Sequence, residues 1–303
     1  MGRVGEDVVR IAGVLPPIPT PFSDDEVNIK ALRLNVKKWM ATRIRGVVVL
    51  GSNGEAPLLD EEESVAVIEA TREQVPSDRL CIAGTGRETT KGVIEATRRA
   101  AEVGVDAVLV RTPSFFKTLL TPDALTTHYV AVADASPVPV LLYNFTALTG
   151  VTLGVDVVSV LSEHPNIIGM KESGSDLKFV SALVDQTPDE FFILTGSAPV
   201  FYPSLVVGAS GGVLALASVV PDLCVELYEL TRAGQADQAR QLQRRISPLA
   251  SLVTSIYGVP GLKAALSLLG FDVGPPRAPL CSVSTDAVNA IRKSLERLEM
   301  PMS

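Results

Sequence analysis

A lysine and a tyrosine stand at the ends of two consecutive apolar runs of this 303-residue chain. Lys171 ends the run in "IIGMKESGSD", and Tyr143 ends the preceding run in "PVLLYNF". An amine held in apolar surroundings loses part of its protonated population, so it can attack a ketone carbonyl and form an imine. A phenol on the neighbouring strand can carry protons to and from such an adduct. The pair predicts Schiff-base chemistry, although a lysine at the end of a strand can also be an ordinary solvated group.

The segment "GSNGE" also follows an apolar run and contains our two candidates for binding a carboxylate, Ser52 and Asn53. Short hydroxyl and amide side chains, together with backbone N–H groups, can hold a carboxylate without adding a competing charge. A carbonyl substrate that carries a neighbouring carboxylate is a 2-oxo acid. We therefore expect a small-molecule 2-oxo acid as the substrate.

These residues belong to a repeating pattern in which short apolar runs alternate with longer amphipathic segments. Eight such units predict an α/β fold, specifically a (β/α)8 TIM barrel, in which reactive groups lie at the carboxyl ends of the strands. A doubly wound sheet is the alternative. The eight runs are "GVLPPIPTPF" from Gly13, "GVVVLGS" from Gly46, "LCIAGTG" from Leu80, "AVLVRTP" from Ala107, "PVLLYNF" from Pro139, "IIGMKES" from Ile167, "FFILTGS" from Phe191 and "GGVLALA" from Gly211.

The pattern becomes wholly helical after residue 220, with Pro and Gly interruptions at "GVPG" and "GPPRAP". We expect residues 1–225 to form the catalytic barrel and residues 226–303 to form a C-terminal helical extension. The extension has several apolar faces, so it should pack on the barrel or on a second subunit.

Composition narrows the classes of function. The formal net charge is −7 with both signs interspersed, which argues against nucleic acid and an anionic membrane as partners. No apolar run approaches the roughly 20 residues that span a bilayer, and three distant cysteines predict neither a disulfide framework nor a zinc site. We expect a cytoplasmic protein. The ends of the apolar runs carry no histidine or carboxylate cluster, so we expect no metal.

Two further features of the sequence are an arginine in a strand and a glycine-rich segment. Arg111, in "LVRTP", is unusual inside a barrel strand. We expect it to point outward to an acidic partner or a subunit interface; the alternative is that it faces a distal carboxylate of the substrate. The segment "GTGRETT" is glycine-rich, but it lacks the lysine and the spacing of a phosphate-binding loop.

Five motifs in this order, "PTPF", "GSNGE", "YN", "GMKES" and "GVPGLK", resemble the N-acetylneuraminate lyase and dihydrodipicolinate synthase superfamily of class I aldolases. The resemblance covers nearly the whole chain. It implies a (β/α)8 barrel with a helical C-terminal extension, usually assembled as a homotetramer from two tight dimers. It also implies that no metal or organic cofactor is used, because the substrate is held as a covalent imine.

The resemblance also assigns roles by position. It implies that Lys171 forms the imine with pyruvate or another 2-oxo acid and that Tyr143 shuttles protons. Ser52 and Asn53 match the pair that holds the carboxylate, and Val213 matches a backbone contact to bound pyruvate. Ser173, two residues after the lysine, is a candidate contact to the distal part of the substrate.

Within the superfamily, "HPNIIGMKESG" and "GPPRAPL" look most like 4-hydroxy-2-oxoglutarate aldolase, which forms pyruvate and glyoxylate. Synthases of dihydrodipicolinate carry an arginine where this chain has Leu148. Phe115 or Phe116 replaces a tyrosine that completes a proton relay across the dimer interface, so water or Ser114 would have to substitute. Aldolases of 2-keto-3-deoxy sugar acids, a dihydrodipicolinate synthase and a non-catalytic ligand-binding protein remain alternatives.

Overall fold

Eight parallel strands form one sheet in the computed structural model, which describes residues 9–300 and 302. Each strand lies inside one of the eight predicted runs, so that prediction is confirmed. Neighbours in the sheet follow the order β1, β10, β9, β8, β7, β6, β5, β4. The strands are β1 (Gly13–Leu15), β4 (Gly46–Val49), β5 (Leu80–Gly84), β6 (Ala107–Arg111), β7 (Val140–Asn144), β8 (Ile167–Glu172), β9 (Phe192–Thr195) and β10 (Gly211–Val213).

The first and last strands of this order, β1 and β4, also meet, so the sheet curls into a barrel. The Val48 N–H donates to the carbonyl of Pro16 at 2.9 Å, and the Ile18 N–H donates to the carbonyl of Val48 at 3.0 Å. Strand β1 ends at Leu15 because Pro16 and Pro17 have no N–H to continue a ladder. The fold is therefore a (β/α)8 TIM barrel rather than a doubly wound sheet.

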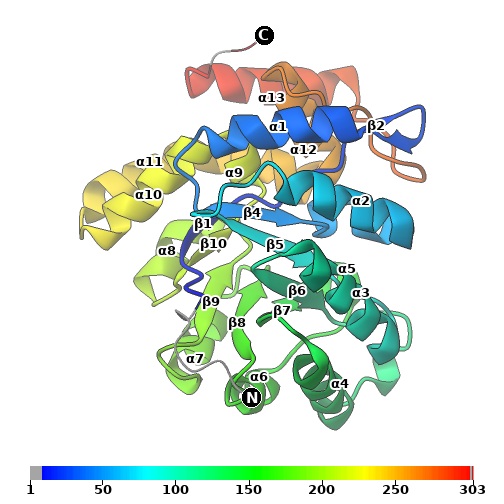
Figure 1. Ribbon diagram of the computed structural model, residues 1–303. Coiled ribbons are helices and arrows are strands. Elements are labelled where there is room, and N and C mark those ends of the chain that lie inside the picture. Colours follow the sequence, from blue (N-terminus) through cyan, green and yellow to red (C-terminus); the bar gives the residue numbers. More distant parts are fainter. Residues whose placement is uncertain (1–8, 301, 303) are drawn as a thin grey trace.

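Helices surround the barrel and connect its strands (Figure 1). Their first turns carry the polar residues that satisfy free N–H groups: Asp60 forms a capping box with Glu63 at α2, and the Thr89 hydroxyl accepts from the Gly92 N–H at α3. The helices up to residue 219 are α1 (Ile29–Met40), α2 (Glu61–Arg72), α3 (Thr90–Val103), α4 (Pro122–Ala135), α5 (Thr146–Thr149), α6 (Val155–Ser162), α7 (Leu177–Gln186), α8 (Phe201–Val206) and α9 (Leu216–Val219).

A short hairpin between β1 and α1 was not predicted. It pairs β2 (Phe22–Ser23) with β3 (Glu26–Val27) in antiparallel orientation. Asp24 and Asp25 both have positive φ, at 51° and 68°. This is the conformation that a two-residue turn of type I′ requires, and Asp tolerates it better than most residues.

Four helices follow the barrel and pack against its outside near α1 (Figure 1). They are α10 (Pro221–Arg232), α11 (Ala236–Ser251), which continues into a π-helical segment (Leu252–Ile256), α12 (Gly258–Leu268) and α13 (Thr285–Arg297). The indole N–H of Trp39 in α1 donates to the Ser218 carbonyl at 2.9 Å, and its ring stacks on Phe271. The predicted boundary at residues 225 and 226 falls inside the continuous helix α10, so the two segments share that helix.

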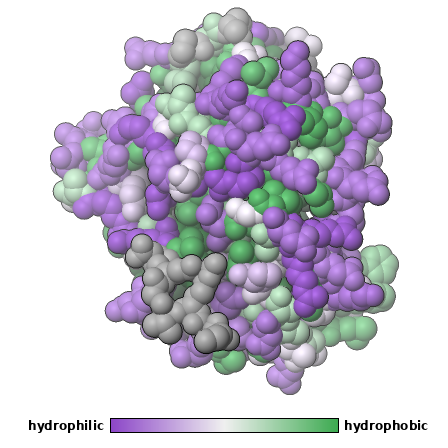
Figure 2. All heavy atoms as spheres, viewed as in Figure 1, coloured by the Kyte–Doolittle hydropathy of each residue, from purple (hydrophilic) through white to green (hydrophobic). Residues whose placement is uncertain are grey.

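The apolar core has two layers. An inner cluster fills the barrel and includes Leu15, Val48, Leu109, Leu141 and Leu194. An outer cluster lies between the strands and the helices and continues into α10–α13, so the C-terminal helices share one core with the barrel. The face seen in Figure 2 is largely hydrophilic, with hydrophobic residues in small separate groups. Among the residues that the structure describes, no helix has the length and apolarity needed to cross a bilayer.

Candidate active site

Lys171 and Tyr143 lie side by side because β7 and β8 pair in parallel with these two residues in register. Residues paired across parallel strands share a face, and Tyr143 belongs to the inner cluster of the barrel. The Nζ atom of Lys171 lies 4.3 Å from the centroid of the Tyr143 ring, and only 4% of Lys171 is exposed. The structure thus brings the two predicted catalytic residues together in a nearly dry position inside the barrel.

Ser52 joins this pair from the loop after β4. Its Oγ atom lies 3.0 Å from the hydroxyl of Tyr143. The loop is a single turn of 3-10 helix, Ser52–Gly54, bounded by Leu50 and Glu55, which have positive φ angles of 55° and 57°. Such angles are costly for these residue types and need support from their surroundings. Asn53 is half-buried in the same turn, beside Ser52.

Thr20 supplies part of that support. Its hydroxyl donates to the Gly54 carbonyl at 2.6 Å and so ties the turn to the segment after β1.

The other two predicted contacts, Ser173 and Val213, also lie at the carboxyl ends of strands. A Cβ atom at Gly196, after β9, would lie 3.0 Å from Lys171 Cε and 2.1 Å from Ser173 Oγ. Ser173 therefore lies within a few ångströms of the lysine, and Gly196 leaves the space that both side chains occupy. Val213 ends β10, is buried and belongs to the inner cluster.

A second buried polar pair holds the loops on the other side of these strands. The side-chain amide of Asn144 donates to Glu172, and its oxygen accepts from the Leu153 N–H at 3.1 Å. Glu172 also accepts from the Gly174 N–H. Burial raises the pKa of Glu172, while the hydrogen bonds from Asn144 and Gly174 oppose that increase. This network fixes the chain just after Tyr143 and Lys171.

Glu55, directly after the Ser52–Gly54 turn, is held by the C-terminal extension. Its Oε1 atom lies 2.6 Å from Nζ of Lys263 in α12, and both side chains are at most 2% exposed. The Arg277 N–H donates to Glu55 Oε2 at 2.8 Å, and Lys263 donates to the Pro275 carbonyl at 2.9 Å. Burial lowers the pKa of Lys263, and the hydrogen bond and charge of Glu55 oppose that decrease.

The prediction that Arg111 points outward is wrong, although it does have an acidic partner. Arg111 pairs in register with Tyr143 and has the parity of Leu109, which lies in the inner cluster. A Cβ atom at Gly86 would lie 2.4 Å from Arg111 Cγ, so the stem of Arg111 packs against Gly86, in the loop after the neighbouring strand β5. Its Nη1 atom donates to Glu88 Oε1 at 2.9 Å and to the Thr112 carbonyl at 3.0 Å.

Glu88 also orders the loop after β6. The carboxylate accepts from the N–H and hydroxyl groups of Ser114 and from the N–H of Phe115. Burial alone would raise the pKa of Glu88, but these hydrogen bonds and the one from Arg111 hold it at about 2. The Ser114 hydroxyl is thus engaged with Glu88.

Exposed apolar side chains at this end of the barrel include Phe115, Phe116 and Leu148. Phe115 is 77% exposed, Phe116 is 67% exposed, and their rings pack edge to face with centroids 5.0 Å apart. Leu148, in the loop after β7, is also exposed. None of the three carries a polar group that could bind a substrate or move a proton.

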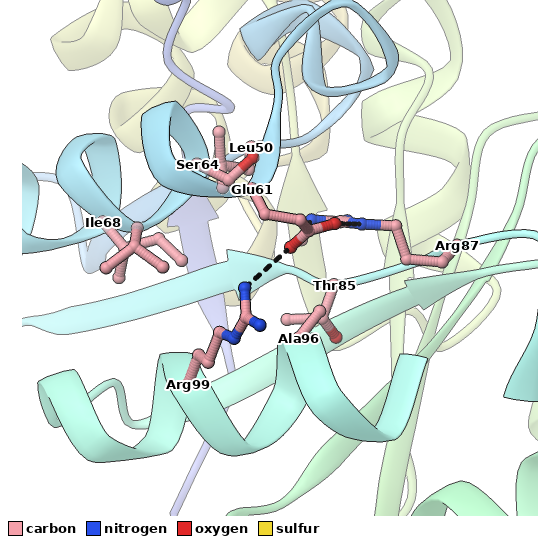
Figure 3. A pocket seen from close by; sticks show the side chains of 10 residues that line it. Leu50, Glu61, Ser64, Ile68, Thr85, Arg87, Ala96 and Arg99 are labelled. Carbon is pink, nitrogen blue, oxygen red and sulfur yellow. Dashed lines mark hydrogen bonds and ion pairs between the residues drawn. The ribbon is translucent and has the colours of Figure 1, made fainter. Parts of the chain in front are cut away.

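The hollow in Figure 3 lies elsewhere, on the outside of the barrel between α2 and α3. Glu61 crosses it and pairs with Arg87 at 2.6 Å and with Arg99 at 3.7 Å. It contains none of the predicted site residues. Within residues 9–300 and 302, no group of three or more histidine, cysteine or carboxylate side chains is arranged to hold a metal ion.

Sequence reasoning did not assign roles to Glu55, Lys263 or Glu88. Glu55 and Lys263 both lie in quoted motifs, "GSNGE" and "GVPGLK", but their pairing joins segments more than 200 residues apart, which no local pattern reveals. The only sequence feature that pointed to Glu88 was the glycine-rich segment "GTGRETT", in which Gly86 makes room for the Arg111 side chain.

This chain resembles known proteins over nearly its whole length. The model of the dihydrodipicolinate synthetase family matches residues 10–298. A 4-hydroxy-tetrahydrodipicolinate synthase of Methanopyrus kandleri is 35% identical over 95% of this chain and 97% of its own. An uncharacterised lyase of Halobacterium salinarum, described as DapA-like, is 34% identical over 96% of this chain and 95% of its own.

Among solved structures, the 4-hydroxy-tetrahydrodipicolinate synthase of Methylacidiphilum fumariolicum superposes with a TM-score of 0.91 at 33% identity, covering 96% of each chain. The predicted superfamily is confirmed. The finer prediction of a 4-hydroxy-2-oxoglutarate aldolase is not, because the relatives from Methanopyrus kandleri and Methylacidiphilum fumariolicum are both named as 4-hydroxy-tetrahydrodipicolinate synthases.

Proposed function

This chain belongs to the dihydrodipicolinate synthetase family, and from that premise we propose that it is a lyase working through an imine between Lys171 and a 2-oxo acid. Pyruvate is the product or the donor. The observation that carries the proposal is the buried Lys171 amine, which lies 4.3 Å from the centroid of the Tyr143 ring. Ser52 is hydrogen-bonded to the Tyr143 hydroxyl. A solvated lysine of the ordinary kind would not be enclosed in this way.

Lys171 and Tyr143 supply the nucleophile and the proton carrier that the reaction needs. The Lys171 amine attacks C2 of a 4-hydroxy-2-oxo acid, and the Tyr143 hydroxyl donates the proton with which the C2 oxygen leaves as water, so that the iminium forms beside a Tyr143 phenolate. The Tyr143 oxygen takes the proton of the C4 hydroxyl, the C3–C4 bond breaks, and its electron pair enters the iminium to give an enamine and a free aldehyde. Protonation at C3 and hydrolysis then release pyruvate and restore the amine. Condensation with an aldehyde follows the reverse course.

The hydroxyl of Ser52 extends this proton path, since its Oγ lies 3.0 Å from the Tyr143 hydroxyl. We assign to Ser52 and Asn53 the carboxylate of the bound 2-oxo acid, next to C2, because their short polar groups and the backbone N–H groups of the turn can hold it. The backbone of Val213 and the hydroxyl of Ser173 complete the proposed set of contacts. The proposal includes no metal or organic cofactor, because the imine itself accepts the electron pair.

Two candidates for the aldehyde partner have support. The printed names of the relatives favour condensation of pyruvate with aspartate semialdehyde, as in a 4-hydroxy-tetrahydrodipicolinate synthase. The motifs favour glyoxylate, as in a 4-hydroxy-2-oxoglutarate aldolase. The exposed Leu148, which replaces the arginine expected of a synthase, tells against the first candidate. Sugar-derived 2-keto-3-deoxy acids are the third class to test.

The decisive experiment is to trap the imine. The protein is incubated with pyruvate and borohydride, and the modified peptide is mapped by mass spectrometry. We expect one reduced adduct, on Lys171. Lys178→Ala, which removes a lysine of α7, should retain the adduct, and Lys171→Ala should lose it. Absence of any adduct on Lys171 would end the proposal.

A coupled assay of pyruvate release and consumption then ranks the partners and tests the non-catalytic alternative. Turnover of any of the three substrate classes that disappears in Lys171→Ala excludes a protein that only binds its ligand. Turnover confined to aspartate semialdehyde would favour the synthase, whereas turnover confined to 4-hydroxy-2-oxoglutarate would favour the aldolase.

A further inference from the structure

Arg111 lies on β6, the strand next to the one that carries Tyr143. Its side chain is on the inner face of the barrel. In the sheet, Arg111, Tyr143 and Lys171 are consecutive partners across β6, β7 and β8. Two strand spacings, about 10 Å, separate the Cα atoms of Arg111 and Lys171. The side chain of Arg111 is 22% exposed, so it is partly shielded from solvent at the end of the barrel where the strands finish.

The neighbours of Arg111 hold it in place but leave one edge of the guanidinium available. Both of its hydrogen bonds, to Glu88 and to the Thr112 carbonyl, come from Nη1. Its Nε and Nη2 atoms have no protein partner within residues 9–300 and 302. These two atoms form the side-on edge that binds a carboxylate with two parallel hydrogen bonds.

Glu88 does not remove the attraction of Arg111 for a second carboxylate. Its own charge is shared with the N–H groups of Ser114 and Phe115 and the hydroxyl of Ser114, in addition to Arg111. Gly86 leaves room for the stem of Arg111, because a side chain at this position would collide with it. The arginine is therefore pre-oriented, which lowers the entropic cost of binding an anion.

We propose that the Nε and Nη2 atoms of Arg111 bind a carboxylate on the part of the substrate that becomes the aldehyde. The inference rests on the proposed function and narrows it to dicarboxylic substrates, in which one carboxylate adjoins C2 and the other lies beyond C4. Uncharged sugar-derived chains would leave this edge of Arg111 without a partner. Arg111 acts in substrate recognition, and Glu88 is its positioning residue.

The test compares two 4-hydroxy-2-oxo acids that differ at the far end, 4-hydroxy-2-oxoglutarate with a carboxylate and 4-hydroxy-2-oxopentanoate with a methyl group. For Arg111→Leu we expect kcat/KM to fall about 10-fold to 100-fold with the dicarboxylic acid, mainly through KM, and to stay unchanged within error with the methyl compound. Arg111→Lys should lose less, because it keeps the charge without the two-bond geometry.

Arg87→Leu is the matched control. Arg87 precedes Glu88 in the same loop, but its ion pair is with Glu61 on the outside of the barrel (Figure 3). Arg87→Leu should leave kcat/KM unchanged with both the dicarboxylic acid and the methyl compound.

Equal losses of kcat/KM on both substrates in Arg111→Leu and Arg111→Lys, or no loss on either, would overturn the inference. So would a wild-type enzyme that turns over the methyl compound as well as the dicarboxylic acid. Borohydride trapping with pyruvate is measured on every variant. A Lys171 adduct that persists while the substrate preference fails to change refutes the role of Arg111 alone, whereas loss of the adduct from the wild type refutes the proposed function itself.

Discussion

Lys171 has room inside the barrel because Gly196, just after the end of β9, has no side chain. A Cβ atom there would approach Lys171 Cε to 3.0 Å and overlap Ser173 Oγ. We expect Gly196→Ala to lower kcat about 100-fold by displacing the amine, since displacements of about 1 Å have effects of this size. Trapping rates with pyruvate and borohydride would measure it, alongside the midpoint of thermal unfolding. An unchanged trapping rate would show that the lysine does not need this space.

Single residues were predictable where a local pattern defined their place. Lys171, Tyr143 and Ser52 each follow an apolar run, and the carboxyl ends of barrel strands converge, so their proximity followed from the fold. The direction in which the Arg111 side chain points could not be predicted from the fold. Its run is short, and the face to which a side chain points depends on register, which only the pairing with Tyr143 and the gap at Gly86 establish.

At the scale of elements, the strands and the main helices were predictable from apolar periodicity, and α2 begins at a recognisable capping box. The β2–β3 hairpin was missed because its strands have two residues each, too few for a pattern. The helical pattern begins after residue 220, where α10 begins, so the predicted boundary at residue 226 falls inside a helix that periodicity itself indicates.

The loop that carries Ser52 and Asn53 depends on α12 through the pair of Glu55 and Lys263. We expect Lys263→Met to lower the free energy of unfolding by about 3–5 kcal/mol, because it leaves the Glu55 carboxylate buried without a cation. The variant should also raise KM for pyruvate. Chemical denaturation and steady-state kinetics would measure the two effects.

An exposed ion pair of similar length is the control. Arg33 and Glu73 are joined at 2.8 Å, and both side chains are largely in solvent. Arg33→Met should lower the free energy of unfolding much less than Lys263→Met does, because solvent screens the exposed pair. If Lys263→Met costs no more than Arg33→Met, the buried pair does not hold the loop. The double variant Glu55→Leu with Lys263→Met should cost less than the sum of its single changes, since it removes both buried charges.

The loop after β6 should respond to acid through Glu88. The pKa of Glu88 is about 2 in the folded protein and 4.5 in the reference state, so ionisation of Glu88 stabilises the folded state. This contribution is fully present above about pH 4.5 and disappears as the pH falls toward about 2. Thermal unfolding of wild type and Glu88→Gln should therefore differ most above pH 4.5 and converge in acid. A difference that is independent of pH would contradict this assignment.

At the scale of the whole molecule, assembly into a homotetramer stays a prediction. The exposed and mutually packed Phe115 and Phe116 favour it, since such a pair is costly to leave in water. Light scattering should give the mass of an oligomer, and Phe115→Asp with Phe116→Asp should shift it to smaller species. Val206→Asp, at another exposed apolar residue, is the control. A wild-type protein that is monomeric at micromolar concentration would end this prediction.

The contact between Glu55 and the Arg277 backbone, which are 222 residues apart in sequence, has a consequence for how the protein is made. While the ribosome is still translating the C-terminal helices, a nascent chain with all eight strands already outside the exit tunnel lacks the groups that hold Glu55. Its Ser52–Gly54 turn is held at that stage by Thr20 but not through Glu55, so the nascent polypeptide should form the pyruvate adduct less efficiently until synthesis has passed this arginine.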